Sequence, residues 1–264
     1  MGIETVRPMN AAVESAAKQH TTTVKMEKTM IPSVEDPITD SFEDKFVGLS
    51  ALKLIRWSVD EFGDDLIVST SFGIQSVTTL KLATMIKPDI KIVWIDTGYL
   101  PEETVAYAKT LTDLLDLNLH VYKAEQSPEE MEAEHGKLWE SDRVEDLNLY
   151  DQIRKVKPMK RALTELNGRG WISGLRADQT DYRKRLPPIK RTGSRFRMYP
   201  ILEWTNRDVY YFMDDNELPQ HPLFSKGYTT VGDAHSSRPL EADDDNERAT
   251  RFRGKKQECG IHTF

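Results

Sequence analysis

Short apolar runs rich in β-branched residues alternate with segments of helical periodicity from about residue 46 onward, and this alternation constrains the fold more than any other feature of the chain. Such an alternation is typical of a parallel sheet with helices packed on both faces, so we expect an α/β fold. The expected strands are residues 66–71, 90–96, 119–122, 171–174 and 198–202, and the expected helices lie near 47–62, 77–85, from 101 onward, 128–140, 152–167 and 205–216.

The chain of 264 residues is long enough for one large α/β domain. Residues 1–45 are polar and rich in Thr, without apolar periodicity or the apolar core of a signal peptide, and they predict a flexible N-terminal arm. We expect residues 46–240 to form the α/β domain. Little periodicity follows residue 217, and residues 241–264 predict a C-terminal tail.

The net charge of −7 argues against broad attraction to nucleic acid or to a membrane surface. Basic residues are concentrated in 183–197 and 248–256, which indicates a small anionic ligand, although either run alone is also typical of a solvated surface. No stretch approaches the ~18 apolar residues that span a membrane. One cysteine and no secretory signal indicate a reducing compartment: the cytoplasm, or a plastid in a photosynthetic eukaryote.

Polar residues follow the ends of three expected strands. Ligands of parallel sheets bind beyond the carboxyl ends of the strands, so we expect residues 69–75, 96–99 and 174–183 to converge. The first segment combines hydroxyl groups with Gly73 at a strand-to-helix junction, where free backbone N–H groups favour an anion. It lacks the Lys and the second glycine of a Walker A loop. Asp96 suits contact with a nucleoside, and a capped loop is an equal alternative.

Cys259 is the only cysteine, so the chain can form neither an intramolecular disulfide nor a cysteine-rich metal site. Its position leaves both a reactive thiol and a buried apolar side chain open. Arg248 and Arg251 lie about one helical turn apart and could hold one anion together. The basic residues of 153–161, taken alone, favour a solvated helix face.

Several segments, taken in order, resemble the family of adenylyl-sulfate (APS) and 3′-phosphoadenylyl-sulfate (PAPS) reductases. They are Ser-Thr-Ser-Phe-Gly-Ile-Gln at 69–75, Asp-Thr-Gly-Tyr-Leu at 96–100, Gly-Lys-Leu-Trp-Glu at 136–140, Lys-Val-Lys-Pro-Met-Lys-Arg-Ala-Leu at 155–163 and Glu-Cys-Gly-Ile-His at 258–262. The resemblance runs from about residue 45 to the end. It implies a doubly wound, adenine-nucleotide α-hydrolase-like fold, usually dimeric, with thioredoxin or a glutaredoxin-like protein as the reductant.

The resemblance also separates two branches of the family. Residues 69–76 resemble a modified pyrophosphate loop of the ATP pyrophosphatases, with Gln75 where those enzymes carry an acid for metal-bound ATP. The reductase family has two branches, of which one binds an iron–sulfur cluster through a Cys-Cys pair and a Cys-x-x-Cys pair and the other has no cluster. The corresponding residues, 150–151 and 233–236, supply no thiolate, so no cluster and no bound metal are expected. The cluster-free branch usually uses PAPS rather than APS.

By the resemblance, the thiolate of Cys259 attacks the sulfo group, leaving S-sulfocysteine and adenosine 3′,5′-bisphosphate, or AMP from APS. A free cysteine is only a few per cent thiolate at pH 7, so nearby cations and His262 are expected to favour the thiolate. Because the chain has no second cysteine, an external thiol must release sulfite. We expect residues from about 240 onward to be mobile without ligand and to close over the nucleotide.

An ATP-dependent adenylating enzyme on the same scaffold remains open as another class of function, and so does a non-catalytic nucleotide-binding or redox-partner protein.

The resemblance implies two sets of site residues. Candidates for an added 3′-phosphate are Arg176, Arg185, Lys190 and Arg238. The catalytic set is Cys259, His262 and Tyr228, and the substrate-binding set is Ser69, Ser71, Gly73, Gln75, Asp96, Lys155, Gly174, Arg176, Arg183, Arg238, Arg248 and Arg251.

Overall fold

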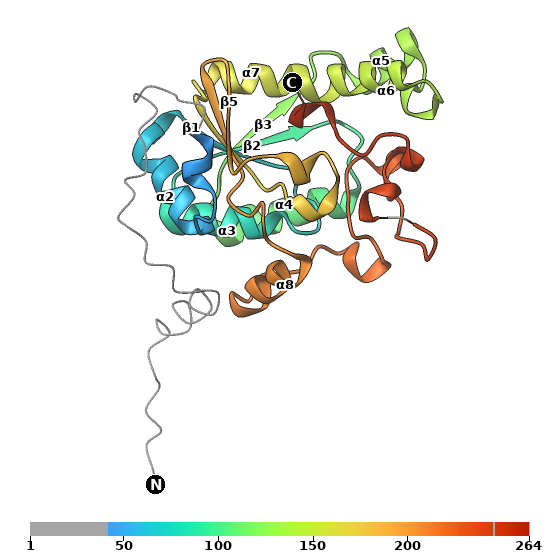
Figure 1. Cartoon of the computed structure of the whole chain (residues 1–264). Coiled ribbons are helices and arrows are strands. Elements are labelled where there is room, and N and C mark those ends of the chain that lie inside the picture. The colour runs from blue at the N-terminus through green and yellow to red at the C-terminus, as the bar shows by residue number, and fades with distance from the viewer. Residues whose placement is uncertain (1–41, 245, 264) are drawn as a thin grey trace. The chain divides into compact units, whose positions relative to one another are not determined.

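The computed structural model describes residues 42–244 and 246–263, which all belong to one compact unit, Ser33–Phe264 (Figure 1). Most of the predicted arm, residues 1–41, lies outside the described residues. The folded core begins before the predicted boundary at residue 45, because Phe42 is only 2% exposed and its ring lies 6.1 Å from that of Phe196.

A six-stranded sheet organises the described chain, in the order β3-β2-β1-β4-β6-β5. All neighbouring strands are parallel except the pair β5 and β6, which confirms the predicted α/β class. The hairpin of β5 and β6 was not predicted, and the expected strand at 198–202 overlaps it only at Met198. The strands are β1 (Leu66–Thr70), β2 (Lys91–Asp96), β3 (Asn118–Lys123), β4 (Gly170–Ser173), β5 (Ile189–Thr192) and β6 (Arg195–Met198).

Helices connect the parallel strands, and most lie where the periodicity predicts them. The predicted helix 128–140 is interrupted at Gly136, whose φ of 71° is rarely adopted by other residues. The predicted helix 152–167 begins as a π turn, Gln152–Val156, and the helix before it was not predicted. The helices are α2 (Ala51–Phe62), α3 (Ser76–Ile86), α4 (Glu102–Leu115), α5 (Pro128–His135), α6 (Val144–Asp151), α7 (Lys157–Glu165) and α8 (Asn206–Asp215).

Short 3-10 turns fill much of the remaining chain, including the C-terminal tail. They are Glu43–Phe46, Gly63–Asp65, Leu138–Glu140, Ala177–Gln179, Arg183–Arg185, Phe224–Lys226, Ala234–Ser236, Glu247–Thr250, Phe252–Gly254 and Gly260–His262.

The two faces of the sheet are covered by different helices, with α7 on one side and α2, α3 and α4 on the other (Figure 1). Successive strand residues point to opposite faces. Accordingly, Leu66 and Val68 belong to the larger core cluster, whereas Ile67 between them packs with Met159 of α7. Strands buried on both faces explain why β1 and β2 are almost continuously apolar.

The chain reverses its direction of travel across the sheet at β1, because β2 and β3 lie on one side of it and β4 on the other. Such a switch point leaves a crevice beyond the carboxyl ends of the two diverging strands. Ser69 of β1 and Ser173 of β4 are paired in register at this edge. The predicted convergence is confirmed for the ends of β1 and β4, and Thr97 after β2 lines the same cavity.

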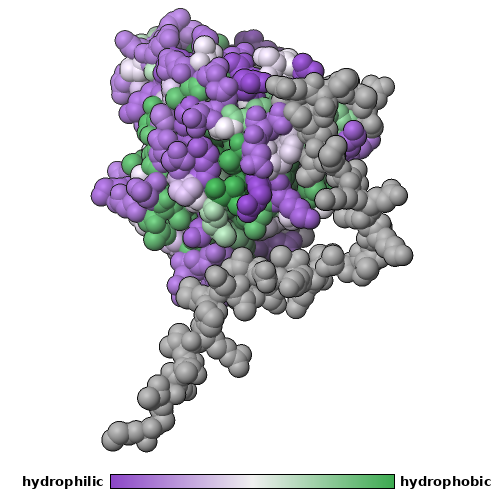
Figure 2. All heavy atoms as spheres, turned by 90° about the vertical axis from the view of Figure 1, so that its left-hand side faces the viewer, coloured by the Kyte–Doolittle hydropathy of each residue, from purple (hydrophilic) through white to green (hydrophobic). Residues whose placement is uncertain are grey.

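Hydrophobic residues lie at the surface between hydrophilic ones on the face shown in Figure 2. Exposed aromatic side chains include Tyr210 and Tyr211 of α8. None of the helices in residues 42–244 and 246–263 has the length and apolar character needed to cross a membrane.

Candidate active site

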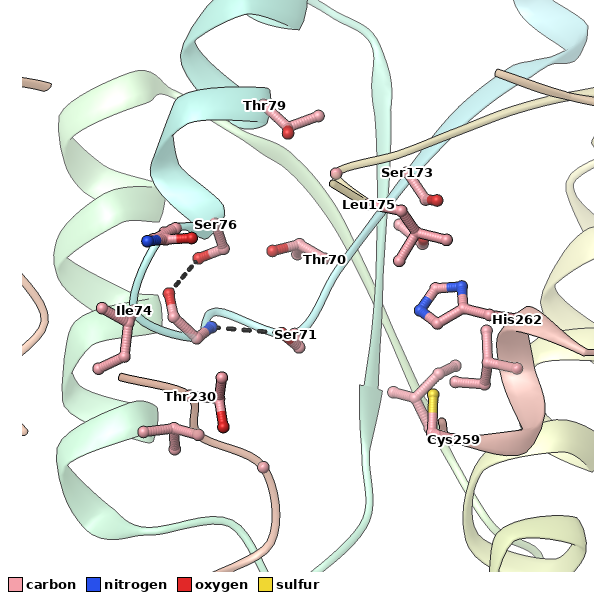
Figure 3. Close-up of a pocket in the computed structure, with 18 of the residues that line it drawn as sticks. Thr70, Ser71, Ile74, Ser76, Thr79, Ser173, Leu175, Thr230, Cys259 and His262 are labelled. Atoms are coloured by element: carbon pink, nitrogen blue, oxygen red, sulfur yellow. Dashed lines mark hydrogen bonds between the residues drawn. The ribbon is translucent and has the colours of Figure 1, made fainter. Parts of the chain in front are cut away.

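A cavity beyond the carboxyl ends of β1 and β4 gathers most of the residues expected to bind substrate. Figure 3 shows the loop after β1, with Ser71, Ile74 and Ser76, on one side of this cavity, and Cys259 and His262 of the tail on the other. The thiol therefore faces the expected anion-binding loop. The expected residues that line the cavity are Ser69, Ser71, Gly73, Gln75, Lys155, Gly174, Arg176, Arg183, Arg248, Arg251, Cys259 and His262.

The loop after β1 is shaped by hydrogen bonds between near neighbours. The backbone N–H of Gly73 donates to the Ser71 hydroxyl at 3.3 Å, and the Ser76 hydroxyl donates to the Gly73 carbonyl at 2.8 Å (Figure 3). A Cβ on Gly73 would lie 3.3 Å from the carbonyl oxygen of Val231, so glycine allows the neighbouring segment to approach closely. The N-terminus of α3 follows at once, and its dipole favours an anion in the cavity.

Gln75 is held by a polar network rather than left free for a metal-bound phosphate. Its amide nitrogen donates to the Asn206 side chain at 2.7 Å, and its amide oxygen accepts from Arg176 at 2.6 Å. Arg176 is 1% exposed and also donates to Asn206 and to Asp178. Burial lowers the pKa of Arg176, and Asp178 opposes this effect.

The four candidates for the 3′-phosphate do not converge on one point of the cavity. Arg176 lines it, but the guanidinium is engaged by the neighbours described above. Arg238 lies outside the cavity lining and forms an ion pair with Asp244, which raises the pKa of Arg238 through a hydrogen bond. Arg185 is exposed and donates to a backbone carbonyl, and Lys190 lies on the hairpin strand β5.

Two other expected residues, Asp96 and Tyr228, also lie outside the described lining of the cavity. Asp96 caps its own loop by accepting the backbone N–H of Gly98 at 2.9 Å, and it pairs with Lys123 at 3.0 Å. This is the capped loop that the sequence left open as the alternative. Tyr228 packs against the small apolar cluster that contains Val231.

Lys155 enters the site from the π turn between α6 and α7. Pro158 follows this turn and has no N–H to donate, so the regular α-helical bonding cannot continue through it. The turn directs Arg154 and Lys155 inward, with exposed fractions of 2% and 7%. The solvated helix face that the sequence favoured for 153–161 is therefore wrong for these two residues. Arg154 donates to the carbonyl of Thr97 and braces the loop after β2.

Arg248 and Arg251 bring further positive charge to the same cavity. Burial lowers the pKa of Arg248, and the neighbouring arginines Arg183 and Arg251 add to this effect. Like charges crowded together in this way are stabilised by an anion between them. Gly232 provides the space for Arg251, because a Cβ there would lie 2.0 Å from the guanidinium.

The segment that carries Cys259 is attached to the domain by long-range contacts. Glu258 accepts two hydrogen bonds from Arg183, both at 2.8 Å, and one from the Thr180 hydroxyl at 2.6 Å. Gly260 packs so closely on the π turn that a Cβ would lie 2.8 Å from a methyl group of Val156. These contacts hold the tail over the cavity in this structure.

His262 lies near several arginines, which act on the charge of its imidazole. Burial lowers the pKa of His262 well below its usual value, and Arg183 and Arg248 lower it further. The imidazole is therefore neutral at pH 7, and the expected support of the Cys259 thiolate by His262 stays a prediction. The cations that line the cavity with Cys259 are Lys155 and the arginines.

Two acidic residues of the site, Asp151 and Asp233, were not expected from the sequence as functional residues. Both are 1% exposed and both pair with Lys155. The available signal was the spacing of Asp151 and Lys155, four residues apart on one helix face. The two stretches aligned with cluster ligands also meet here, since His235 lies 3.0 Å from the Tyr150 hydroxyl. Within residues 42–244 and 246–263, no group of three or more His, Cys, Asp and Glu side chains is arranged to hold a metal ion.

Comparison with known proteins identifies the family. The sequence model described as the phosphoadenosine phosphosulfate reductase domain matches residues 65–239. The chain is 56% identical over 213 residues to phosphoadenosine 5′-phosphosulfate reductase of Synechococcus sp., covering 81% of this chain and 92% of that protein. It is 40% identical over 250 residues to the reductase of the same name from Alteromonas mediterranea, covering 95% of this chain and 97% of that protein.

Solved structures agree in fold. The crystal structure of phosphoadenylyl-sulfate (PAPS) reductase from Candida auris, a phosphate complex, matches with a TM-score of 0.66 and 27% identity, covering 78% of this chain and all of that chain (100%). FMN adenylyltransferase of Candida glabrata matches with a TM-score of 0.53 and 12% identity over 74% of this chain and 66% of that chain, a likeness of fold alone. The chain belongs to the phosphoadenosine phosphosulfate reductase family.

Proposed function

We propose that the protein is a thiol-dependent reductase of PAPS, which releases sulfite and adenosine 3′,5′-bisphosphate in sulfate assimilation. The observation that carries the proposal is the position of the only thiol. Cys259 lines a cavity that also contains Lys155, Arg248, Arg251 and an anion-binding helix N-terminus. The names of the relatives at 40–56% identity support the same activity.

In the proposed first step, the Cys259 thiolate attacks the sulfur of the sulfo group. The bond between that sulfur and the phosphate oxygen breaks, and its electron pair leaves with the adenosine 3′,5′-bisphosphate. Cys259 then carries the sulfo group as S-sulfocysteine. A thiolate and a sulfo group repel each other, so the cationic side chains of Lys155, Arg248 and Arg251 reduce the barrier by stabilising negative charge.

In the second step, a thiolate of an external dithiol attacks the sulfur of Cys259 and displaces sulfite. The second thiol of the dithiol then resolves the mixed disulfide and restores Cys259. The dithiol supplies the two electrons of the reduction. An external partner is needed because the chain contains one cysteine. We propose thioredoxin, or a glutaredoxin-like protein, as this partner.

The loop after β1 is the proposed site for the phosphosulfate. Ser69, Ser71 and Gly73 line the cavity there, at the N-terminus of α3. Gln75 cannot serve as the acid that metal-bound ATP requires, and its amide is occupied by Arg176. This supports a substrate that is already activated and argues against an ATP-dependent adenylating enzyme.

The preference for PAPS over APS rests on the names of the relatives, because the candidates for the 3′-phosphate are dispersed over the site. Reduction of APS with release of AMP, without an iron–sulfur cluster, is the alternative. We also propose a homodimer in the cytoplasm, or in a plastid if the source is a photosynthetic eukaryote.

The test is sulfite release from PAPS and from APS in parallel, with reduced thioredoxin and the thioredoxin-free reaction as the control. We expect sulfite from PAPS at a kcat/KM at least about tenfold higher than from APS, a difference of about 1.4 kcal/mol. The reverse preference would replace PAPS by APS as the substrate. No sulfite from either nucleotide would contradict the proposed reaction.

A further inference from the structure

Lys155 is held between two buried carboxylates. Its Nζ lies 3.0 Å from Oδ1 of Asp151 and 2.8 Å from Oδ2 of Asp233. The Lys155 side chain is 8% exposed and each aspartate side chain 1%. The two ion pairs hold the ammonium group at the cavity that Lys155 lines, where an anionic ligand can approach it.

All three groups of this cluster are charged near neutral pH. Burial lowers the pKa of Lys155, but Asp151 and Asp233 raise it by more, so the pKa ends above its usual value. Burial raises the pKa of Asp233, but Lys155, His235 and Arg251 together lower it by more. Burial also raises the pKa of Asp151, but Lys155 and Lys256 together keep it below its ordinary value. A charged ammonium is therefore fixed at one place beside Cys259.

The two carboxylates connect Lys155 to different parts of the site. Asp151 accepts a hydrogen bond from the backbone N–H of Gly260 at 3.1 Å and forms an ion pair with Lys256 at 2.6 Å. Both partners lie in the tail. Asp233 accepts the hydroxyl of Thr97, at the carboxyl end of β2. One carboxylate thus reaches the residue after Cys259 and the other reaches the edge of the sheet.

We propose that Asp151 and Asp233 are positioning residues that hold the Lys155 ammonium against the sulfo group of the bound substrate. Asp151 also links this placement to the docked tail through Gly260. The proposal rests on the proposed function, since it assigns Lys155 to the sulfo group. Burying three charges costs free energy unless they are well paired, and a neutral core would avoid that cost. A fixed cation at the reacting group is what the arrangement provides.

The test compares two ligands that differ by the sulfo group, PAPS and adenosine 3′,5′-bisphosphate. Binding of both is measured in a Cys259→Ser background, which prevents turnover. Asp151→Asn should weaken PAPS by about tenfold, the loss of one well-placed charged contact, and the bisphosphate by less than about threefold. Lys155→Met should weaken PAPS by a similar or larger factor. Adding Asp233→Asn to Lys155→Met should cause no further loss, because Asp233 acts through the lysine.

Two further variants keep the test interpretable. Asp233→Asn is expected to behave as Asp151→Asn does. The double variant of Lys155 and Asp233 removes two buried charges together and leaves Asp151 paired with Lys256 at 2.6 Å, so it is expected to fold. Asp64→Asn, whose exposed carboxylate pairs with Lys87 at 3.2 Å, is the matched control and should change neither affinity. Equal weakening of both ligands, or losses that add in the double variant, would overturn the proposal.

These outcomes are separate from a failure of the proposed function. If the wild type releases no sulfite, the function is wrong, while selective and non-additive losses of PAPS affinity would still support the positioning role. If the wild type releases sulfite and the losses are additive, the function stands and the positioning role is wrong. For the active enzyme, Asp151→Asn should lower kcat/KM for PAPS by about tenfold or more.

Discussion

The loop after β1 and the C-terminal tail face each other across the cavity, but they are held by different kinds of contact. The loop is ordered by hydrogen bonds that span two or three residues, as between Gly73 and Ser71. The tail is ordered by contacts to distant residues, with Glu258 bonded to Arg183, 75 residues away, and Gly260 to Asp151, 109 residues away.

This difference matches the two steps of the proposed reaction. A loop fixed by local bonds at the end of a buried strand holds the nucleotide in one place. The end of the tail, which carries Cys259, is held by the contacts of Glu258 and Gly260, and it can leave that place at a smaller cost because opening of so short a segment breaks few contacts. The thiol must meet the substrate first and an external dithiol afterwards, so we infer that the tail moves and the loop does not.

The largest expected effect separates the chemistry from the binding. Cys259→Ser should lower sulfite release by at least about 10³-fold, because the nucleophile is lost. Binding of adenosine 3′,5′-bisphosphate, measured by calorimetry, should stay within about threefold of the wild type because the loop is unchanged. Sulfite release near the wild-type rate would show that the thiol is not the nucleophile.

The second effect concerns the attachment of the tail. Glu258→Gln replaces the carboxylate that accepts two hydrogen bonds from Arg183, and we expect kcat/KM for PAPS to fall by about tenfold as the closed tail is destabilised. The melting temperature should change little, since the tail lies outside the main core. The control is Glu241→Gln, whose exposed carboxylate lies 3.7 Å from Arg238. An unchanged kcat/KM would argue that the Glu258 contact does not hold the tail for catalysis.

The third effect is a pH dependence of stability. Burial lowers the pKa of His235 from 6.5 to about 4, so between these values the unfolded chain binds a proton that the folded protein does not. The contribution of the buried, neutral His235 to the free energy of unfolding is complete above pH 6.5. It is lost as the pH falls toward 4, by up to about 1.4 kcal/mol per pH unit. His235→Phe should remove this part of the slope in urea unfolding at several pH values. An identical slope in wild type and variant would contradict the assignment.

The smallest expected effect is a difference in hydrogen exchange between the tail and the loop after β1. Adenosine 3′,5′-bisphosphate should slow hydrogen exchange in residues 246–263 more than in residues 66–75, because the loop is already ordered. Exchange in the tail that is fast and equal with and without the nucleotide would rule out closure of the tail over the ligand.

Local patterns predicted the elements that local forces determine. The apolar runs of β1 to β4 and the hydroxyl-rich loop at 69–75 follow from burial and from a strand-to-helix junction, and both were predicted. The hairpin of β5 and β6 was missed because basic residues alternate through it and conceal its apolar face.

The cluster around Lys155 could not be predicted from periodicity. A sequence pattern assigns charged residues to the surface, whereas Arg154 and Lys155 are 2% and 7% exposed. Their burial depends on Asp233, 78 residues after Lys155, and on the carbonyl of Thr97, 57 residues before Arg154. Such partners are brought together only by the complete fold. The resemblance named Lys155, but it did not indicate the two carboxylates that hold it.

The central claim, that Cys259 receives the sulfo group, is tested most directly by mass spectrometry of the protein incubated with PAPS in the absence of reductant. We expect one added sulfonate, located on the peptide that contains Cys259 and released as sulfite when reduced thioredoxin is added. Consumption of PAPS without any sulfonate on Cys259, or a sulfonate that thioredoxin does not release, would contradict it.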